Sequence, residues 1–157
     1  MDQIFYTYET AFGNIVIVSD GSAITALYLE NSKNFNGKKT ENKLTNRAAK
    51  QLEEYFSGKR RQFDVPLRPS GTSFQQAAWN GLLSIPYGET RSYKQVAQMI
   101  GNPNVSRAVG MANNKNPIWI MIPCHRVVGS TGELVGYAGG LEMKKKLLEL
   151  EKTFKPK

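Results

Sequence analysis

The sequence predicts an α+β protein built from two small domains. Alternating apolar residues fill the first thirty positions, apolar residues at helical spacing dominate the second half, and residues 66–71, rich in Pro, Ser and Gly, separate the two patterns. A chain of 157 residues that is 40% hydrophobic and 10% aromatic has the balance of an ordinary globular protein. We therefore predict one domain over residues 1–70 and a second over residues 71–157.

The first domain is predicted to be a small antiparallel sheet covered by a helix. Residues 4–8 alternate between apolar and polar, and residues 15–29 hold two apolar runs separated by an Asp-Gly hairpin signal. Helical spacing predicts a helix over residues 44–55, with Gly58 as its C-terminal cap. The alternation at residues 63–67 predicts one more strand.

The second domain is predicted to be a winged helix-turn-helix. Thr72 should cap its first helix. Apolar spacing predicts two short helices over residues 93–100 and 105–112, a hairpin over residues 127–135 as the wing, and a last helix over residues 143–150. In a helix-turn-helix the second helix enters a DNA groove. The same spacing also fits an ordinary helical hairpin.

The charge favours an anionic partner such as nucleic acid. The formal net charge is +8, and residues 71–157 hold 11 basic and 5 acidic side chains, whereas residues 1–70 hold 10 and 8. No apolar run approaches the roughly 18 residues that a membrane-spanning helix needs, and the N-terminus lacks a secretion signal. We therefore expect a cytoplasmic protein with no membrane partner.

The chain has one cysteine and one histidine, and they are adjacent, at Cys124 and His125. This excludes a disulfide framework and a Cys/His zinc site within one chain, so we expect no metal. An isolated cysteine is usually a buried small hydrophobe. Here Pro123 should end an extended segment at the thiol, while His125, Arg126 and Arg107 should lower the thiol pKa. In a strand, Cys124 and His125 would face opposite sides, so they can cooperate only across a turn or a bridging water.

Residues 122–128, with the sequence IPCHRVV, resemble the acceptor motif of the O6-alkylguanine-DNA alkyltransferases, also called methylated-DNA:protein-cysteine methyltransferases. The resemblance covers residues 72–151 in order. It includes residues 74–76, 86–89, 92–93, 101–103, 107–110, 116–117 and 136–141. The N-terminal half fits the family's size and sheet-plus-helix character without a comparable motif.

The resemblance implies DNA repair by direct reversal of damage. The thiolate of Cys124 would take a methyl or larger alkyl group from O6 of guanine in double-stranded DNA, and O4 of alkylated thymine stays open as a second substrate. Because the thioether product is stable, each molecule would act once. The family's chemistry needs no cofactor and no obligate protein partner, so we expect a monomer.

The resemblance also implies roles for residues around the thiol. His125 would act as a base through water, oriented by Glu151. Tyr93 would donate a hydrogen bond to the guanine and help to rotate the target phosphate, and Asn116 would anchor the turn before the acceptor segment. From pattern alone, Glu151 fits a solvated helix carboxylate, Tyr93 a core residue and Asn116 a simple turn.

DNA contacts are implied for the second helix of the helix-turn-helix. The target nucleotide must be flipped out of the duplex, and Arg107 would fill the gap. In this family the helix enters the minor groove, where the small residues Ala108, Gly110 and Ala112 would allow close approach. Taken alone, Arg107 fits a phosphate-contacting or surface arginine equally well.

A glycine-containing loop is implied as the wall of the alkyl pocket. The backbone amides of Tyr137 and Ala138 would bond to guanine O6, and Gly139 would permit close backbone approach. Ala138 stands where many members have Ser, which bears on substrate preference more than on activity. Lys144 would approach the same loop, although residues 144–146 also fit a solvated basic face.

Three other functions fit part of the sequence. A binding-only alkyltransferase-like protein would recognise the lesion without repairing it, but such proteins have Trp at the position of Cys124. A winged-helix transcription regulator would bind specific sequences and ignore the lesion. A cysteine hydrolase would need turnover and an oxyanion hole, and no sequence feature calls for either.

Overall fold

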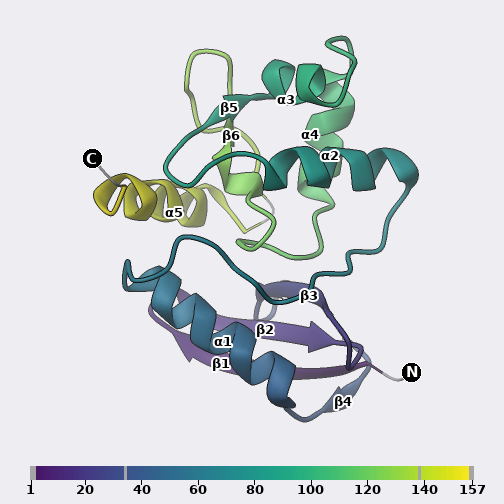
Figure 1. Ribbon diagram of the computed structural model, residues 1–157, viewed down its shortest axis with the longest axis vertical. Helices are drawn as coiled ribbons and strands as arrows, with labels where there is room; N and C mark the ends of the chain where they lie inside the picture. Colours follow the sequence, from purple (N-terminus) through teal and green to yellow (C-terminus); the bar gives the residue numbers. More distant parts are fainter. Residues whose placement is uncertain (1–2, 34, 138, 156–157) are drawn as a thin grey trace. The chain divides into compact units, whose positions relative to one another are not determined.

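The computed structural model describes residues 3–33, 35–137 and 139–155, and Figure 1 shows its helices and strands. The chain divides into two compact units. Unit 1 is Met1–Ser70 with Pro117–Trp119, and unit 2 is Gly71–Asn116 with Ile120–Lys157. Among the described residues, no helix is both long enough and apolar enough to cross a membrane.

Unit 1 is built on a four-stranded sheet with the strand order β3-β2-β1-β4. Its strands are β1 (Ile4–Thr10), β2 (Gly13–Ser19), β3 (Ile24–Leu29) and β4 (Lys38–Lys39). The first three are antiparallel neighbours, and β4 runs parallel to β1. The predicted hairpin between β2 and β3 is confirmed, and Gly21 in its turn has the positive φ of 95° that glycine tolerates.

Helix α1 (Lys43–Phe56) covers one face of this sheet, as Figure 1 shows. Its buried side chains include Leu52 and Tyr55. The helix ends at Phe56, with Ser57 as its C-terminal cap, so the predicted cap residue Gly58 lies one position further along. The Gly58 amide donates to the Tyr55 carbonyl at 3.1 Å, and the Lys59 amide donates to the Glu54 carbonyl at 2.8 Å, which is the Schellman pattern.

The strand expected over residues 63–67 does not form. Leu67 makes only an isolated parallel bridge with Ile24 of β3. The Ile24 amide donates to the Pro66 carbonyl, and the Arg68 amide donates to the Ile24 carbonyl, both at 2.8 Å. Pro66 has no N–H to offer a neighbouring strand, so the ladder stops there.

A short segment from the second half of the sequence also belongs to unit 1. The Leu27 amide of β3 donates to the Pro117 carbonyl at 2.8 Å, and the Trp119 amide donates to the Leu27 carbonyl at 2.9 Å. The chain therefore leaves unit 2 after Asn116 and returns to it at Ile120, four residues before the cysteine.

Unit 2 is mainly helical. Its elements are α2 (Ser73–Leu83), β5 (Arg91–Ser92), α3 (Tyr93–Met99), α4 (Ser106–Asn114), the 3₁₀ helix η1 (Cys124–Arg126), β6 (Val127–Val128) and α5 (Leu141–Thr153). The predicted helices are confirmed, and Thr72 caps α2 in a reciprocal pair with Gln75. Helices α2, α3 and α4 pack around the buried side chains of Trp79, Val96 and Val109.

The hairpin predicted over residues 127–135 is not formed as such. A turn closes where the Gly129 amide donates to the Glu133 carbonyl at 2.8 Å. However, β6 pairs in parallel with β5, and Leu134 and Val135 form no strand. The Val135 carbonyl instead accepts hydrogen bonds from side chains, so the second arm of the expected wing is a loop held by Tyr93 and Lys144.

We predict that Gly58→Ala destabilises the protein. Gly58 has a φ of 80°, and a residue with a Cβ loses about 1–2 kcal/mol in the left-handed region. The free energy of unfolding from urea titration should fall by about that amount. Gly58→Asn should lose less, because Asn tolerates this region better. Equal losses for Ala and Asn would contradict the role of the positive φ.

Candidate active site around Cys124

The backbone turns sharply at the cysteine. The prediction that an extended segment precedes Cys124 is wrong. Residues 119–122 form turns and a bend, and Cys124 begins the 3₁₀ helix η1. Ile120 has a φ of 72°, which is rare for a β-branched residue, and its burial in the core holds it there. As a result, Cys124 and His125 lie on one tight helical turn rather than on opposite faces of a strand.

The Cys124 thiol is buried, with only 1% of the residue exposed. The Asn116 side-chain amide donates to the Cys124 Sγ at 3.2 Å and to the Ile122 carbonyl at 3.0 Å. The Asn113 side-chain amide donates to the Cys124 carbonyl at 3.2 Å. Two asparagines from the end of α4 and the turn after it therefore fix the acceptor segment, and one of them touches the sulfur itself.

Burial raises the pKa of the Cys124 thiol to about 11. The hydrogen bond from Asn116, the positive charge of Lys144 and a hydrogen bond with Tyr137 oppose that effect without overcoming it. The expectation of a lowered thiol pKa is therefore wrong. At neutral pH the free protein holds a neutral thiol surrounded by groups that favour the thiolate.

Neither arginine expected to activate the thiol does so. Arg126 is buried and forms an ion pair with Glu151. Its Nε donates to Oε1 and its Nη2 donates to Oε2, both at 2.9 Å. Its remaining nitrogen, Nη1, donates to the Ile85 carbonyl at 2.7 Å. Arg107 is exposed on α4, where water screens its charge.

Glu151 of α5 is a buried carboxylate with four hydrogen bonds. Besides the two from Arg126, its Oε2 lies 2.7 Å from His125 Nε2, and its Oε1 accepts from the Gly88 amide at 3.0 Å. Burial alone would raise the pKa of Glu151, but His125 and Arg126 together lower it well below its usual value. Glu151 is thus ionised and rigidly held, not solvated, and its predicted contact with His125 is present.

His125 is held as a neutral base. A carboxylate can only accept, so the proton shared with Glu151 lies on Nε2, and Nδ1 carries the free lone pair. Nδ1 is buried and has no hydrogen-bond partner among the described residues. Burial lowers the pKa of His125 below its usual value against the opposing pull of Glu151. This histidine can therefore accept a proton at Nδ1.

Two side chains hold the loop at Val135. The buried Lys144 Nζ donates to the carbonyls of Val135 at 2.7 Å and Gly136 at 3.3 Å. Burial lowers the pKa of Lys144 to about 8, and a charge on Cys124 would raise it again. The Tyr93 hydroxyl also donates to the Val135 carbonyl, at 3.0 Å. Lys144 therefore approaches the loop as predicted and is not part of a solvated face.

The next residues of the loop bring a phenol to the thiol. Burial raises the pKa of Tyr137 well above its usual value, and the neighbouring Cys124 adds to that rise. The sequence pointed only to the Tyr137 backbone amide. Gly139 is partly exposed, and Ala138 lies outside the described residues.

Helix α4 presents a mixed face. Arg107 is exposed, and Ala108 and Gly110 are partly exposed, as a DNA-facing surface requires. Ala112 is only 2% exposed, and its carbonyl accepts a hydrogen bond from Trp79 Nε1 at 2.9 Å. The expectation that Ala112 faces DNA is therefore wrong, because that side of α4 packs against α2.

Three features of the site were missed by the sequence interpretation. They are the pairing of Arg126 with Glu151, the mutual effect of Tyr137 and Cys124 on their pKa values, and the exposed Met111 on α4. The spacing of four residues between Arg107 and Met111 places both on one side of a helix and was available as a signal. The other two contacts join residues far apart in the sequence.

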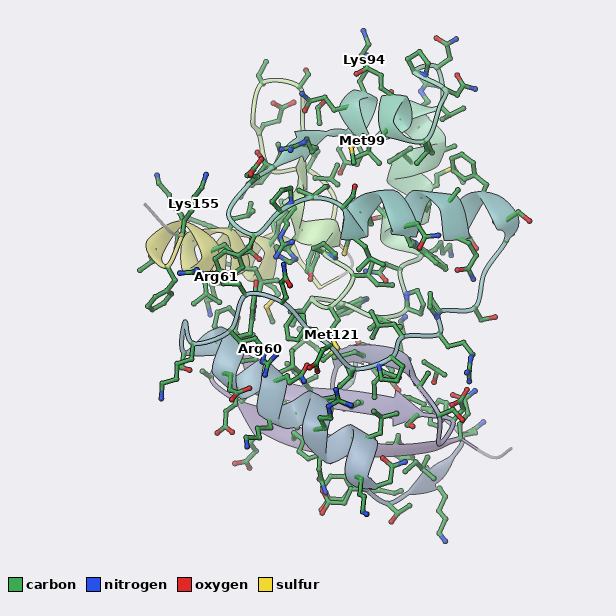
Figure 2. All side chains as sticks on the ribbon, viewed as in Figure 1. Arg60, Arg61, Lys94, Met99, Met121 and Lys155 are labelled. Atoms are coloured by element: carbon green, nitrogen blue, oxygen red, sulfur yellow. The ribbon has the colours of Figure 1, made fainter. Side chains whose placement is uncertain are left out.

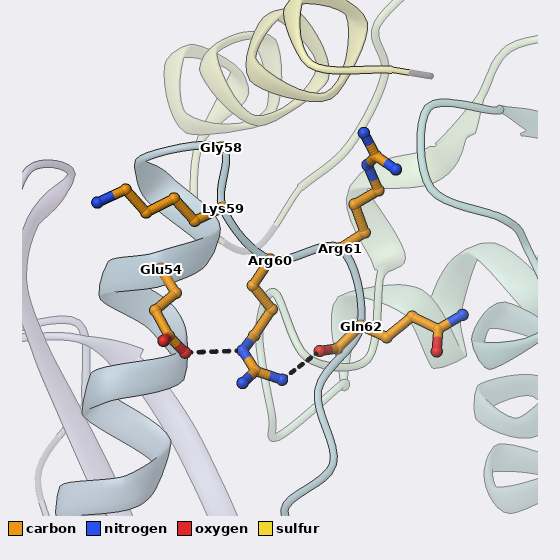
Figure 3. Close-up of a pocket in the computed structure, with 6 residues that line it drawn as sticks. All are labelled: Glu54, Gly58, Lys59, Arg60, Arg61 and Gln62. Atoms are coloured by element: carbon orange, nitrogen blue, oxygen red, sulfur yellow. Dashed lines mark hydrogen bonds and ion pairs between the residues drawn. The ribbon is translucent and has the colours of Figure 1, made fainter. Parts of the chain in front are cut away.

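Two hollows in the structure do not include the cysteine. One, of about 600 Å³ in unit 2, is lined partly by Glu151. The other, of about 660 Å³ in unit 1, lies at the end of α1. Figure 3 shows that its Arg60 bonds to Glu54 and to the Gln62 carbonyl while Lys59 and Arg61 point elsewhere, so its cations do not converge.

Residues 73–153 match the DNA-binding domain of 6-O-methylguanine DNA methyltransferases, and residues 4–69 match the ribonuclease-like domain of the same proteins. The chain belongs to the 6-O-methylguanine DNA methyltransferase family. Helices α3 and α4 lie within the segment that matches the DNA-binding domain. This favours a DNA-binding helix-turn-helix over an ordinary helical hairpin.

Individual relatives support the family assignment along most of the chain. A methylated-DNA–protein-cysteine methyltransferase from Mycobacterium leprae is 45% identical over 147 residues, covering 92% of this chain and 89% of the relative. One from Methanosarcina barkeri is 54% identical over 130 residues, covering 83% and 76%. A structure of Mycobacterium tuberculosis OGT in complex with DNA has a TM-score of 0.91 and 44% identity, covering 98% of this chain and 95% of that one.

We predict that the reactivity of Cys124 in the free protein rises steadily with pH. Because its pKa is about 11, the rate of alkylation by iodoacetamide should increase about tenfold per pH unit between pH 8 and 10. Lys144→Gln removes a charge that favours the thiolate, so it should slow the reaction most near pH 8, and less toward pH 10, where Lys144 itself loses its proton. The exposed neighbour Lys145→Gln should not. A plateau by pH 8 would contradict the raised pKa.

Proposed function

We propose that this chain repairs alkylated DNA by moving an alkyl group from O6 of guanine to Cys124 Sγ. The observation that carries the proposal is the Cys124–His125–Glu151 arrangement, which lies in a segment that matches the family's DNA-binding domain. The relatives' name, methylated-DNA–protein-cysteine methyltransferase, describes the same reaction. The DNA complex of the M. tuberculosis relative supports DNA as the partner, and we propose that this DNA is double-stranded.

The reaction begins with the removal of the thiol proton. His125 Nδ1 takes it through a bridging water, while Glu151 holds the ring through Nε2 and Arg126 holds Glu151. The thiolate then attacks the alkyl carbon. An S–C bond forms, the C–O6 bond breaks, and its electron pair passes to the guanine, which becomes normal guanine on taking back one proton.

The groups around the sulfur stabilise the thiolate during this step. The Asn116 amide and the Tyr137 hydroxyl can each donate to Sγ, and the Lys144 ammonium supplies a positive charge nearby. These interactions are strong in a buried site because water does not compete with them. A local change at the site is therefore enough to lower the thiol pKa when the substrate binds. No rearrangement of the fold is required.

Tyr93 serves the leaving guanine. At rest its hydroxyl donates to the Val135 carbonyl, and in the reaction we propose that it donates to the guanine as charge develops there. Arg107 fills the space that the flipped nucleotide leaves in the duplex. The backbone amide of Tyr137 bonds to guanine O6, and the substrate is the O6-alkylguanine nucleotide.

The thioether product is not readily hydrolysed, so each molecule acts once. The protein works as a monomer on DNA inside the cell. A binding-only role is the second candidate, because the thiol is buried and its pKa is raised in the free protein. The two candidates differ in whether the protein itself becomes alkylated.

Mass spectrometry separates these functions. After incubation with a duplex that contains one O6-methylguanine, we predict a single added methyl group that maps to Cys124 and saturates at one per protein. Cys124→Ser should stay unmodified and still bind the duplex. Unmodified wild-type protein that prefers the damaged duplex would support the binding-only role instead. Unmodified protein with no such preference would contradict both.

A further inference from the structure

Met111 is the most exposed large apolar side chain in the described part of the chain, at 70%. It lies on α4 four residues after Arg107, so both side chains are on one side of the helix. An exposed methionine has no packing reason to be there. Its place on the helix assigned to DNA contact calls for a functional explanation.

The exposed side of α4 borders the loop that closes the acceptor site. A Cβ added to Gly110 would lie 3.7 Å from the Tyr93 ring, and one added to Gly136 would lie 3.7 Å from both the Asn114 side-chain oxygen and the Tyr93 hydroxyl. Tyr93 therefore sits between α4 and this loop. A flipped nucleobase that reaches Cys124 would pass Tyr93. The duplex from which it is flipped would then lie along the side of α4 that carries Arg107 and Met111.

The chemistry of Met111 suits insertion between base pairs. A thioether side chain offers no N–H or O–H with which to read base edges or bind phosphates. Proteins that kink DNA from the minor groove insert apolar side chains such as methionine between base steps. Four helical residues span about 6 Å, which is less than two base-pair steps of about 3.4 Å each. Arg107 and Met111 can therefore act on neighbouring steps.

We propose that Met111 is a positioning residue that wedges open the base step next to the flipped nucleotide while Arg107 fills the vacated space. This inference rests on the proposed function. It adds an apolar side chain to a task that the family resemblance gives to the arginine alone. The wedge lowers the cost of flipping and takes no part in the chemistry at the sulfur.

The test compares transfer from a duplex with transfer from a free base. The variants are Met111→Ala, Met111→Leu and, as a matched control, Met99→Ala, which removes another exposed methionine, 43% exposed, at the end of α3 (Figure 2). Met111→Ala should slow repair of O6-methylguanine in a duplex about tenfold, which corresponds to about 1.4 kcal/mol of lost apolar contact. Transfer from free O6-benzylguanine should not change. Met111→Leu and Met99→Ala should repair the duplex at the rate of the unchanged protein.

Two further readouts separate a wedge from a charge contact. Met111→Ala should leave the salt dependence of duplex binding unchanged, because an apolar contact releases no counterions, whereas Arg107→Ala should reduce it. A 2-aminopurine beside the lesion should fluoresce less with Met111→Ala than with the unchanged protein, because less unstacking occurs.

The outcomes distinguish this inference from the proposed function. If the unchanged protein accepts the alkyl group and Met111→Ala repairs the duplex at the same rate, the wedge role is overturned alone. Equal losses on duplex and free base would also overturn it, because they would place Met111 in the acceptor pocket or the fold. If the unchanged protein accepts the alkyl group from neither substrate, the proposed function fails and the wedge role fails with it.

Discussion

The buried carboxylate of Glu151 is the interaction on which the site depends. It balances the charge of Arg126, holds His125 through Nε2 and fixes the backbone at Gly88, all inside the protein. A buried charge is costly unless its partners are complete, so α5, η1 and the loop before β5 must come together for any of these groups to be stable there. Within unit 2, the fold and the base that we propose for Cys124 therefore rest on the same set of contacts.

The Cys124 thiol is neutral in the free protein, although groups that stabilise the thiolate already surround it. Burial keeps the Cys124 thiol neutral in the free protein, while Asn116, Tyr137 and Lys144 are already placed to stabilise the thiolate. A protein that uses its cysteine once gains from this arrangement. A permanently ionised thiol would react with other electrophiles, whereas a neutral buried thiol reacts slowly until it is deprotonated.

Sequence patterns predicted the elements of the fold well and the contacts between distant residues less well. The cap at Thr72 and the helix stop just before Gly58 are local signals, and both are confirmed. The apolar run before Cys124 was predicted to be extended. Instead, residues 117–119 belong to unit 1, and the chain turns at Ile120 as it returns to unit 2. Charge near a thiol was visible in the sequence. Its cancellation by a carboxylate 25 residues away was not.

Because the chain contains a single histidine, NMR of its imidazole nitrogens reports on the site without ambiguity. We propose that His125 is a neutral base whose proton on Nε2 is held by Glu151, which leaves Nδ1 free to take the thiol proton. We therefore expect a neutral ring at pH 7, protonated on Nε2, that gains its second proton only at a pH below the usual histidine range. An imidazolium at pH 7, or a neutral ring protonated on Nδ1, would contradict it.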